Sequence, residues 1–306
     1  MLALSTSWIS LSIDGGEALL SSLDRPGVVG LELEYRMSRQ LLAGFAPLLT
    51  SHRLRVESVH NYFPIPPGME ETGGGGDLFD LAALDSEARR TAVHWTSETI
   101  RRAADLGASA VVLHCGRVDM DARRRTLYGP FRETGTVSAE IRERLLERLA
   151  ERDRRKPPHL AALRRSLEAL AEPARKAGVV LGLENRNHYH ELPGFEDFAP
   201  LFAQLEGAPI GYWHDTGHAH AQQALGIIPP EEPLASFADR LVGVHLHDAR
   251  GLTDHLPPGD GEIDFESVRR RLGRKTLRVI ELRPGTSSHD VDRAIQTLRT
   301  LGFAEP

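Results

Sequence analysis

Short apolar runs that alternate with helical patterns constrain the fold of this chain more than any other feature. Eight such runs occur, at residues 2–8, 28–34, 55–60, 108–114, 178–184, 210–215, 241–245 and 277–281. They are largely apolar along their whole length, which is typical of parallel strands covered on both faces. A (β/α)8 barrel requires eight strands that alternate with helices. The sequence therefore predicts an α/β fold, a single (β/α)8 TIM barrel.

Helix signals lie between these runs. Asp85 and Ser86 can cap a long helix that ends before Gly107, with apolar residues repeating near one face. A second helix is expected at 160–176 and a third at 287–302, each with apolar residues at helical spacing. This order of strands and helices agrees with the barrel prediction.

Composition places the chain among globular proteins. Of its 306 residues 41% are hydrophobic and 26% are charged, and no apolar run is long enough to span a bilayer. No repeat or linker divides the chain, so residues 1–306 are expected to form one domain. Cys115 is the only cysteine, which excludes an internal disulfide and fits a cytoplasmic protein. The net charge of -6 argues against nucleic acid as a partner.

Two insertions interrupt the regular alternation. Four glycines at 73–76 follow the third strand and predict either a plain mobile loop or a lid over the substrate. The second insertion, 118–158, follows the fourth strand and is rich in arginine, with a mixed-charge helix at 140–155. A solvated helix or the contact surface of a homodimer is the simpler interpretation of this insertion. An anion-binding patch is the alternative, although acidic residues are interleaved throughout.

Histidines and acidic residues collect where the predicted strands end. The carboxyl ends of barrel strands meet at one mouth, so these side chains become neighbours. They are His60, His114, Glu184, Asp215, His245 and Glu281, followed in the loops by His218 and His255. Clustered carboxylates repel one another unless a cation lies between them. The sequence therefore predicts a divalent-metal site at the barrel mouth.

Each of these residues also has a simpler structural interpretation. Glu184 could form a salt bridge with Arg186, and Glu281 could do the same with Arg283. Isolated histidines at strand ends often serve only as hydrogen-bonding groups. His247 alternates with the histidine at 245 and is expected to point away from the mouth, leaving Asp248 as an outer partner or a helix cap.

The motifs at these strand ends resemble a known superfamily over nearly the whole chain. They are Val-Val-Leu-His-Cys-Gly at 111–116, Leu-Gly-Leu-Glu-Asn-Arg at 181–186, His-Asp-Thr-Gly-His-Ala at 214–219, Val-His-Leu-His-Asp at 244–248, His-Leu-Pro-Pro-Gly-Asp-Gly at 255–261 and Val-Ile-Glu-Leu at 279–282. In this order they resemble the xylose isomerase-like TIM barrels, which include sugar and sugar-phosphate isomerases and epimerases and the endonuclease IV family. The resemblance implies a small sugar or sugar phosphate as substrate.

The resemblance to the isomerases and epimerases also implies roles for individual residues. Glu184, Asp215, His245 and Glu281 would hold one divalent ion, namely manganese, cobalt, magnesium or zinc. The two glutamates would remove and return a proton through an enediolate. Further residues would contact the substrate: His218, Arg283, His114 and, as an apolar wall, Trp8.

The resemblance to endonuclease IV implies a different outcome, a zinc phosphoesterase or nuclease with additional metal positions. His60 and His114 would join Glu184 around one further ion, and His218 and His255 would hold part of another. That family has an aspartate two residues before the last histidine, where this chain has Thr253. Asp254 is shifted by one position and is expected to face the other side of an extended chain. A third possibility is a barrel that binds carbohydrate without turnover.

Overall fold

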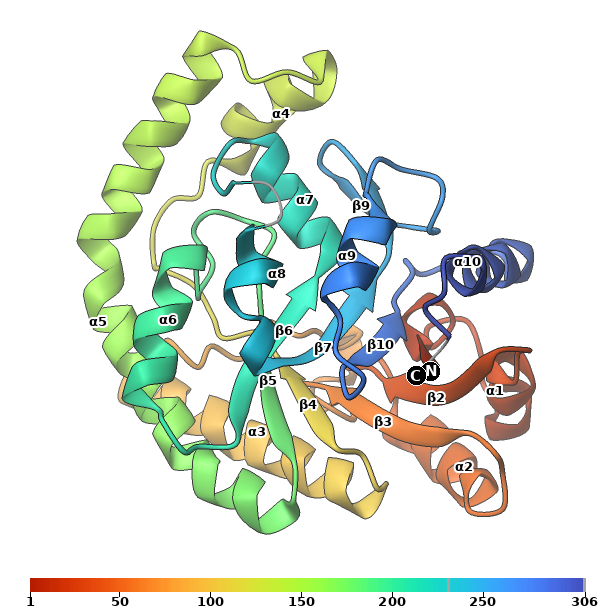
Figure 1. Cartoon of the computed structure of the whole chain (residues 1–306). Coiled ribbons are helices and arrows are strands. Elements are labelled where there is room, and N and C mark those ends of the chain that lie inside the picture. Colours follow the sequence, from red (N-terminus) through yellow and green to blue (C-terminus); the bar gives the residue numbers. More distant parts are fainter. Residues whose placement is uncertain (230–231, 305–306) are drawn as a thin grey trace.

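The chain forms a closed barrel of eight parallel strands surrounded by helices (Figure 1). The computed structural model describes residues 1–229 and 232–304. The barrel strands are β1 (Leu2–Ser5), β2 (Val28–Leu33), β3 (Arg55–His60), β4 (Ala110–Leu113), β5 (Val180–Glu184), β6 (Ile210–Asp215), β7 (Leu241–Leu246) and β10 (Leu277–Ile280). They follow one another around the barrel, and β10 closes it by pairing with β1. The predicted single (β/α)8 barrel is confirmed.

The observed strands lie within or close to the predicted runs. The largest difference is at the first strand, which was expected to reach Trp8 but ends at Ser5. The Ser5 side chain accepts a hydrogen bond from the backbone N–H of Ser7 and thereby begins the short 3-10 helix η1 (Thr6–Trp8). Local capping by a serine side chain therefore outweighs the apolar pattern at this position.

Helices surround the barrel on the outside. They are α1 (Gly16–Leu23), α2 (Arg39–Leu49), α3 (Ser86–Asp105), α4 (Arg124–Thr134), α5 (Ala139–Ala177), α6 (Phe195–Gln204), α7 (Thr216–Ala224), α8 (Glu232–Ser236), α9 (Phe265–Arg271) and α10 (Ser288–Thr300), with the 3-10 helices η2 (Glu70–Thr72) and η3 (Ala238–Arg240). Of the two predicted cap residues of α3, Asp85 is the cap and accepts two backbone N–H groups, whereas Ser86 is the first helical residue. Ser287, where the third helix was expected to start, accepts one backbone N–H as the cap of α10. None of the helices within the described residues has the length and hydropathy of a membrane span.

The arginine-rich insertion after the fourth strand differs from its prediction in one respect. Two separate helices were expected at 140–155 and 160–176, but α5 runs through Pro157 and Pro158 as one helix of 39 residues. Figure 1 shows α5 curving around one side of the barrel. Prolines remove helix hydrogen bonds and usually favour a break. Here His159 follows them and is buried, with its ring bonded to the Ala82 carbonyl and to the Asp119 N–H, which anchors the helix across this point.

The inserted helix α4 packs close to the barrel mouth. Its apolar residues Leu127, Tyr128 and Phe131 are buried against the start of α5 and against α7, the helix that follows β6. The hydroxyl of Tyr189, in the loop after β5, donates to the carbonyl of Ala122 at 2.7 Å. The insertion is therefore attached to the loops that carry the strand-end residues.

A tryptophan fills the barrel beneath the mouth. Trp213 on β6 is fully buried and packs with small residues from other strands. Gly182 and Gly243 on the flanking strands provide the space, since a Cβ at either position would lie within 3.0 Å of the indole ring. The Trp213 and His245 ring centroids are 5.1 Å apart in an edge-to-face arrangement. The tryptophan thus forms the floor under the histidine of the predicted metal site.

Candidate metal centre

Four predicted ligands converge at the carboxyl ends of neighbouring strands. Glu184 ends β5, Asp215 ends β6, His245 lies on β7 and Glu281 follows β10. All four are buried, and their ligand atoms lie within 4.8 Å of one another. The Nδ1 atom of His245 lies 2.7 Å from Glu184 Oε1, 3.2 Å from Glu281 Oε2 and 3.6 Å from Asp215 Oδ2. Three carboxylates and one imidazole form a donor set that suits a divalent cation.

The electrostatics of this group favour positive charge between the carboxylates. Burial alone would raise the pKa of all three acids, but the surrounding histidines more than offset it. The pKa of Glu281 falls to about 2, and those of Glu184 and Asp215 lie well below their usual ranges. Burial lowers the pKa of His245, yet Glu281 and Glu32 raise it well above its usual value. The carboxylates are thus ionised at neutral pH and attract a cation.

Three histidines near these carboxylates have their other ring nitrogen hydrogen-bonded to an outer group. The partners are Glu32 for Nε2 of His245 (3.1 Å), the Asn61 carbonyl for Nδ1 of His60 (3.0 Å) and the Asn185 carbonyl for Nδ1 of His218 (3.0 Å). Nδ1 of His114 lies 3.2 Å from Asp77 in an ion-pair contact that lacks hydrogen-bond geometry. Histidines that bind metals in proteins almost always have such a partner, which fixes the tautomer and the ring orientation. The hydrogen bonding therefore fits a metal site.

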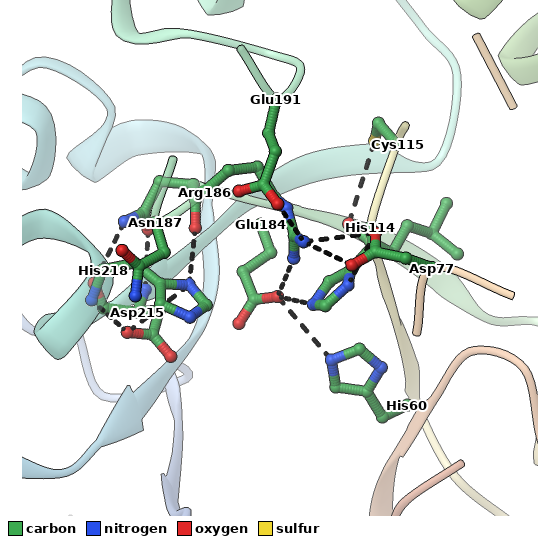
Figure 2. A network of polar contacts seen from close by, with 12 residues as sticks. His60, Asp77, His114, Cys115, Glu184, Arg186, Asn187, Glu191, Asp215 and His218 are labelled. Atoms are coloured by element: carbon green, nitrogen blue, oxygen red, sulfur yellow. Dashed lines mark hydrogen bonds and ion pairs between the residues drawn. The ribbon is translucent and has the colours of Figure 1, made fainter. Parts of the chain in front are cut away.

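Glu184 also belongs to a second group of possible ligands. Its Oε2 atom lies 2.8 Å from Nε2 of His114 and 3.6 Å from Nε2 of His60, and ligand atoms of the three residues lie within 4.8 Å (Figure 2). The salt bridge considered for Arg186 is also present, with Nη1 3.5 Å from the same oxygen. Arg186 is buried and holds Asp77 at 2.9 Å on its other side. The salt bridge and the ligand-like arrangement therefore coexist.

The structure corrects the prediction for Asp254. This residue was expected to face away from the site, but His218, Asp254 and His255 bring ligand atoms within 4.8 Å of one another. The expectation assumed an extended chain, whereas His255 has a φ of 52°, in the left-handed region. Asp254 and His255 lie in the strand β9 (Thr253–Leu256), which pairs irregularly with β8 (Asp248–Arg250), and the left-handed residue breaks the alternation of side chains along it. The residues considered for a third metal position therefore do lie together.

His247 was expected to point away from the mouth, and this prediction is wrong. Its Nε2 lies 2.9 Å from Asp215 Oδ2, and its Nδ1 accepts the backbone N–H of His255 at 2.9 Å. Since Nδ1 is an acceptor, Nε2 carries the hydrogen and donates it to the aspartate. His247 follows the last residue of β7, where strand alternation no longer governs side-chain direction. It acts as a support for Asp215.

The residues predicted to contact substrate are placed less closely around the group. His114 lies in the neighbouring group with His60 and Glu184, and His218 lies in the group with Asp254 and His255. Trp8 is buried in the main apolar cluster, where its indole nitrogen has no hydrogen-bond partner among the described residues. Arg283 has an exposed side chain, and its backbone N–H donates to the carbonyl of His255 at 3.4 Å. The salt bridge considered between Arg283 and Glu281 does not appear among the described contacts.

The glycine-rich segment lies directly against the site. A Cβ at Gly76 would approach the His114 ring to within 2.6 Å, and Asp77, the next residue, contacts both His114 and Arg186. A Cβ at Gly74 would lie even closer to its neighbour, the carbonyl oxygen of Tyr35, which follows β2. The segment thus covers the side of the mouth that holds His60 and His114.

Two acidic residues of the site were not found from the sequence. Glu32 lies on β2 and is fully buried, and Asp77 follows the glycines. Glu32 had a detectable signal, because an acid inside an apolar run is costly unless it is paired. Glu34, at the end of the same run, gives the same signal. The pKa of Glu34 is raised to about 7, because burial outweighs the lowering by Arg36 and Ser10, which contact the carboxylate.

The chain matches a known protein family. The family model described as xylose isomerase-like TIM barrel matches residues 25–301. The chain belongs to this family. No curated protein sequence matches it.

Solved structures of the same superfamily are similar over nearly their whole length. A D-tagatose 3-epimerase-like protein has a TM-score of 0.68 at 17% identity, covering 99% of this chain and 97% of the other. A 3-keto-D-glucoside 4-epimerase from E. coli has a TM-score of 0.65 at 14% identity, covering 99% and 98%. An IolI protein with a bound zinc atom has a TM-score of 0.64 at 14% identity, covering 98% and 96%. At these identities the likeness establishes the fold.

Proposed function

We propose that the protein is a divalent-metal-dependent isomerase or epimerase of a small sugar or sugar phosphate. The observation that carries the proposal is the buried group of Glu184, Asp215, His245 and Glu281 at the barrel mouth. The family match supports it, as do the similar structures named after sugar epimerases. The zinc atom in the IolI structure supports a metal at this site, and we expect manganese, cobalt, magnesium or zinc.

The chain's own residues would bind the substrate and move a proton. When bound, the cation would polarise a substrate carbonyl and its neighbouring hydroxyl. Glu184 and Glu281 are held ionised by the neighbouring histidines, so either can accept a proton from the carbon beside the carbonyl. Because the two acids come from β5 and from the end of β10, they reach the site from different parts of its rim. One would remove the proton and the other would return it.

The test is substitution of the two glutamates, with solvent deuterium incorporation as a second measurement. Glu184→Gln and Glu281→Gln are expected to reduce the turnover of a ketose substrate by at least about 100-fold, the usual minimum for general acid–base catalysis. Incorporation of solvent deuterium at the carbon beside the carbonyl follows the same proton transfer. Glu262→Gln, an exposed acid outside the group, is the control. Full activity in a Glu184→Gln, Glu281→Gln double variant would contradict the proposal.

A second candidate is a zinc phosphoesterase of the endonuclease IV type. The position of Asp254 favours it, because His218, Asp254 and His255 provide the third ligand group that the sequence left in doubt. Metal analysis of the purified protein separates the two candidates. About one ion per chain with ketose turnover supports the epimerase, whereas two or three zinc ions with hydrolysis of a phosphodiester support the phosphoesterase.

A further inference from the structure

Glu32 is a buried carboxylate that reaches the metal centre from a strand that does not neighbour β7. It lies on β2, which is separated from β7 by β1 and β10 in the barrel order. Its side chain nevertheless crosses the barrel interior, and both of its oxygens lie 3.1 Å from Nε2 of His245. Glu32 and His245 are both fully buried. The contact therefore joins two strands that are not neighbours, across the barrel interior.

A second bond fixes the carboxylate itself. The hydroxyl of Ser58, on the adjacent strand β3, donates to Glu32 Oε2 at 2.8 Å. Glu32 and Ser58 are direct partners in the register of β2 and β3, so the regular pairing of the two strands brings their side chains together. Two neighbouring strands thus hold the oxygens of Glu32 under the Nε2 atom of the histidine.

This arrangement decides which nitrogen of His245 faces the other ligands. A histidine that binds a metal has lost one ring proton, so it has one donor and one ligating nitrogen, and a carboxylate only accepts. In the metal-bound centre Nε2 therefore carries the hydrogen that Glu32 accepts, and Nδ1 presents its lone pair. Nδ1 faces Glu184, Asp215 and Glu281, whose oxygens are also acceptors. Acceptor atoms that face one another repel, and a cation between them removes this repulsion.

We propose that Glu32 is the positioning residue of the metal centre, which holds His245 by Nε2 so that Nδ1 becomes its ligating atom. The inference rests on the metal site of the proposed function, but not on which substrate the protein turns over. Glu32 lies outside the four ligands and acts on the ion only through the histidine. It therefore governs metal affinity more than it governs the chemical step.

The experiment measures zinc or manganese affinity of the full chain by competition with a chromophoric chelator. Glu32→Leu removes the acceptor and is expected to weaken binding by about 10- to 100-fold, the usual cost of losing an outer partner of a metal-binding histidine. Glu32→Gln keeps an acceptor oxygen and is expected to lose less. Ser58→Ala tests the same chain of contacts by a change that leaves Glu32 in place. Glu57→Gln is the control, since Glu57 is a half-buried acid next to Ser58 on β3 and belongs to none of the groups of possible ligands.

A spectroscopic measurement separates positioning from a general effect on folding. With zinc bound, nitrogen NMR of the wild-type imidazole should show His245 with its hydrogen on Nε2 and the metal on Nδ1. Unchanged affinity in folded Glu32→Leu protein, or the metal on Nε2 in the wild type, would overturn the inference. Metal binding that depends on Glu32 without any sugar turnover would sustain the inference and reject the proposed function. A wild-type chain that binds neither ion would reject both.

Discussion

His214 shows how a single residue can support the site from outside the barrel. It lies between Trp213 and Asp215 on β6, with its Nδ1 2.9 Å from the Tyr212 hydroxyl. That hydroxyl donates to Asn185 Oδ1, which also accepts the backbone N–H of Asp215 at 2.7 Å. Because the hydroxyl hydrogen goes to Asn185, Nδ1 of His214 must be the donor to Tyr212. These bonds fix the end of the strand that carries the aspartate.

This histidine should make the stability of the protein depend on pH. Burial lowers the pKa of His214 to about 4 in the folded protein, below its ordinary value of 6.5. Between these values the unfolded chain binds a proton that the folded chain does not, so stability falls as the pH drops from 6.5 to 4. The slope contributed by one such group is at most about 1.4 kcal/mol per pH unit. His214→Gln should remove this contribution in urea unfolding measured across the window.

The control for this prediction is a histidine on the protein surface. His94 on α3 is exposed, so His94→Gln should leave the pH dependence of unfolding as it is in the wild type. The prediction is wrong if His214→Gln has the same slope as the wild type between pH 6.5 and pH 4, under identical metal or chelator conditions.

The sequence did not identify Glu32 and Asp77, which contact histidines of the site. The ligand candidates were found because acids and histidines at strand ends share one position in a barrel. Glu32 and Asp77 share no such position, since one lies within β2 and the other follows a glycine-rich segment. Asp254 was misplaced because the left-handed conformation of His255 is not encoded by a glycine. Their contacts depend on tertiary structure and not on spacing along the chain.

At the scale of elements, the segment after β3 controls the position of His114. Gly76 leaves no room for a side chain, because a Cβ there would lie 2.6 Å from the His114 Nδ1 atom. Gly75 has no neighbour within 4 Å of such a Cβ, and its φ is not in the left-handed region. Substitution of Gly76 therefore tests the contact with His114, and the same substitution at Gly75 is the matched control.

Gly76→Ala should displace the His114 ring from Glu184 and Asp77, whereas Gly75→Ala should not. Overpacking of this kind typically costs about 1–3 kcal/mol in the free energy of unfolding. The expected result is a loss of stability in that range and weaker metal binding by the His60, His114 and Glu184 group, measured by denaturation and chelator competition. Equal behaviour of the two variants would show that the segment does not press on His114.

The boundaries of elements were predicted well where a capping side chain marks them and poorly where tertiary contacts decide. Asp85 caps α3 as expected, and α10 begins directly after Ser287, where the third helix was expected to start. The two prolines at 157 and 158 suggested a break, yet buried contacts on both sides keep α5 continuous. A proline shows that a hydrogen bond is lost, but the packing that compensates for this loss comes from residues distant in the sequence.

At the scale of the whole molecule, the barrel architecture was predictable because it follows from local patterns repeated around a closed sheet. The closure itself brings the ligands together. Strands β5, β6, β7 and β10 are consecutive neighbours in the barrel, so the four-residue group joins one continuous half of the wall. An ion bound there would hold these strands to one another in the folded chain. Metal binding and global stability should therefore be linked.

The dependence of stability on free metal concentration gives the number of ions that bind to the folded chain. A ligand that binds only the folded state stabilises it by RT ln(1 + [L]/Kd), which is about 1.4 kcal/mol for each tenfold rise in free metal well above Kd. We expect this slope for the wild type in metal-buffered urea unfolding, as one bound ion requires. A slope two or three times as large would indicate the additional ions of the phosphoesterase candidate, bound also by the His60 and His255 groups. Asp215→Asn should flatten the dependence of stability on metal, because Asp215 belongs to the four-residue group and to no other group of possible ligands. Stability that is independent of metal in the wild type would contradict a metal centre at this mouth.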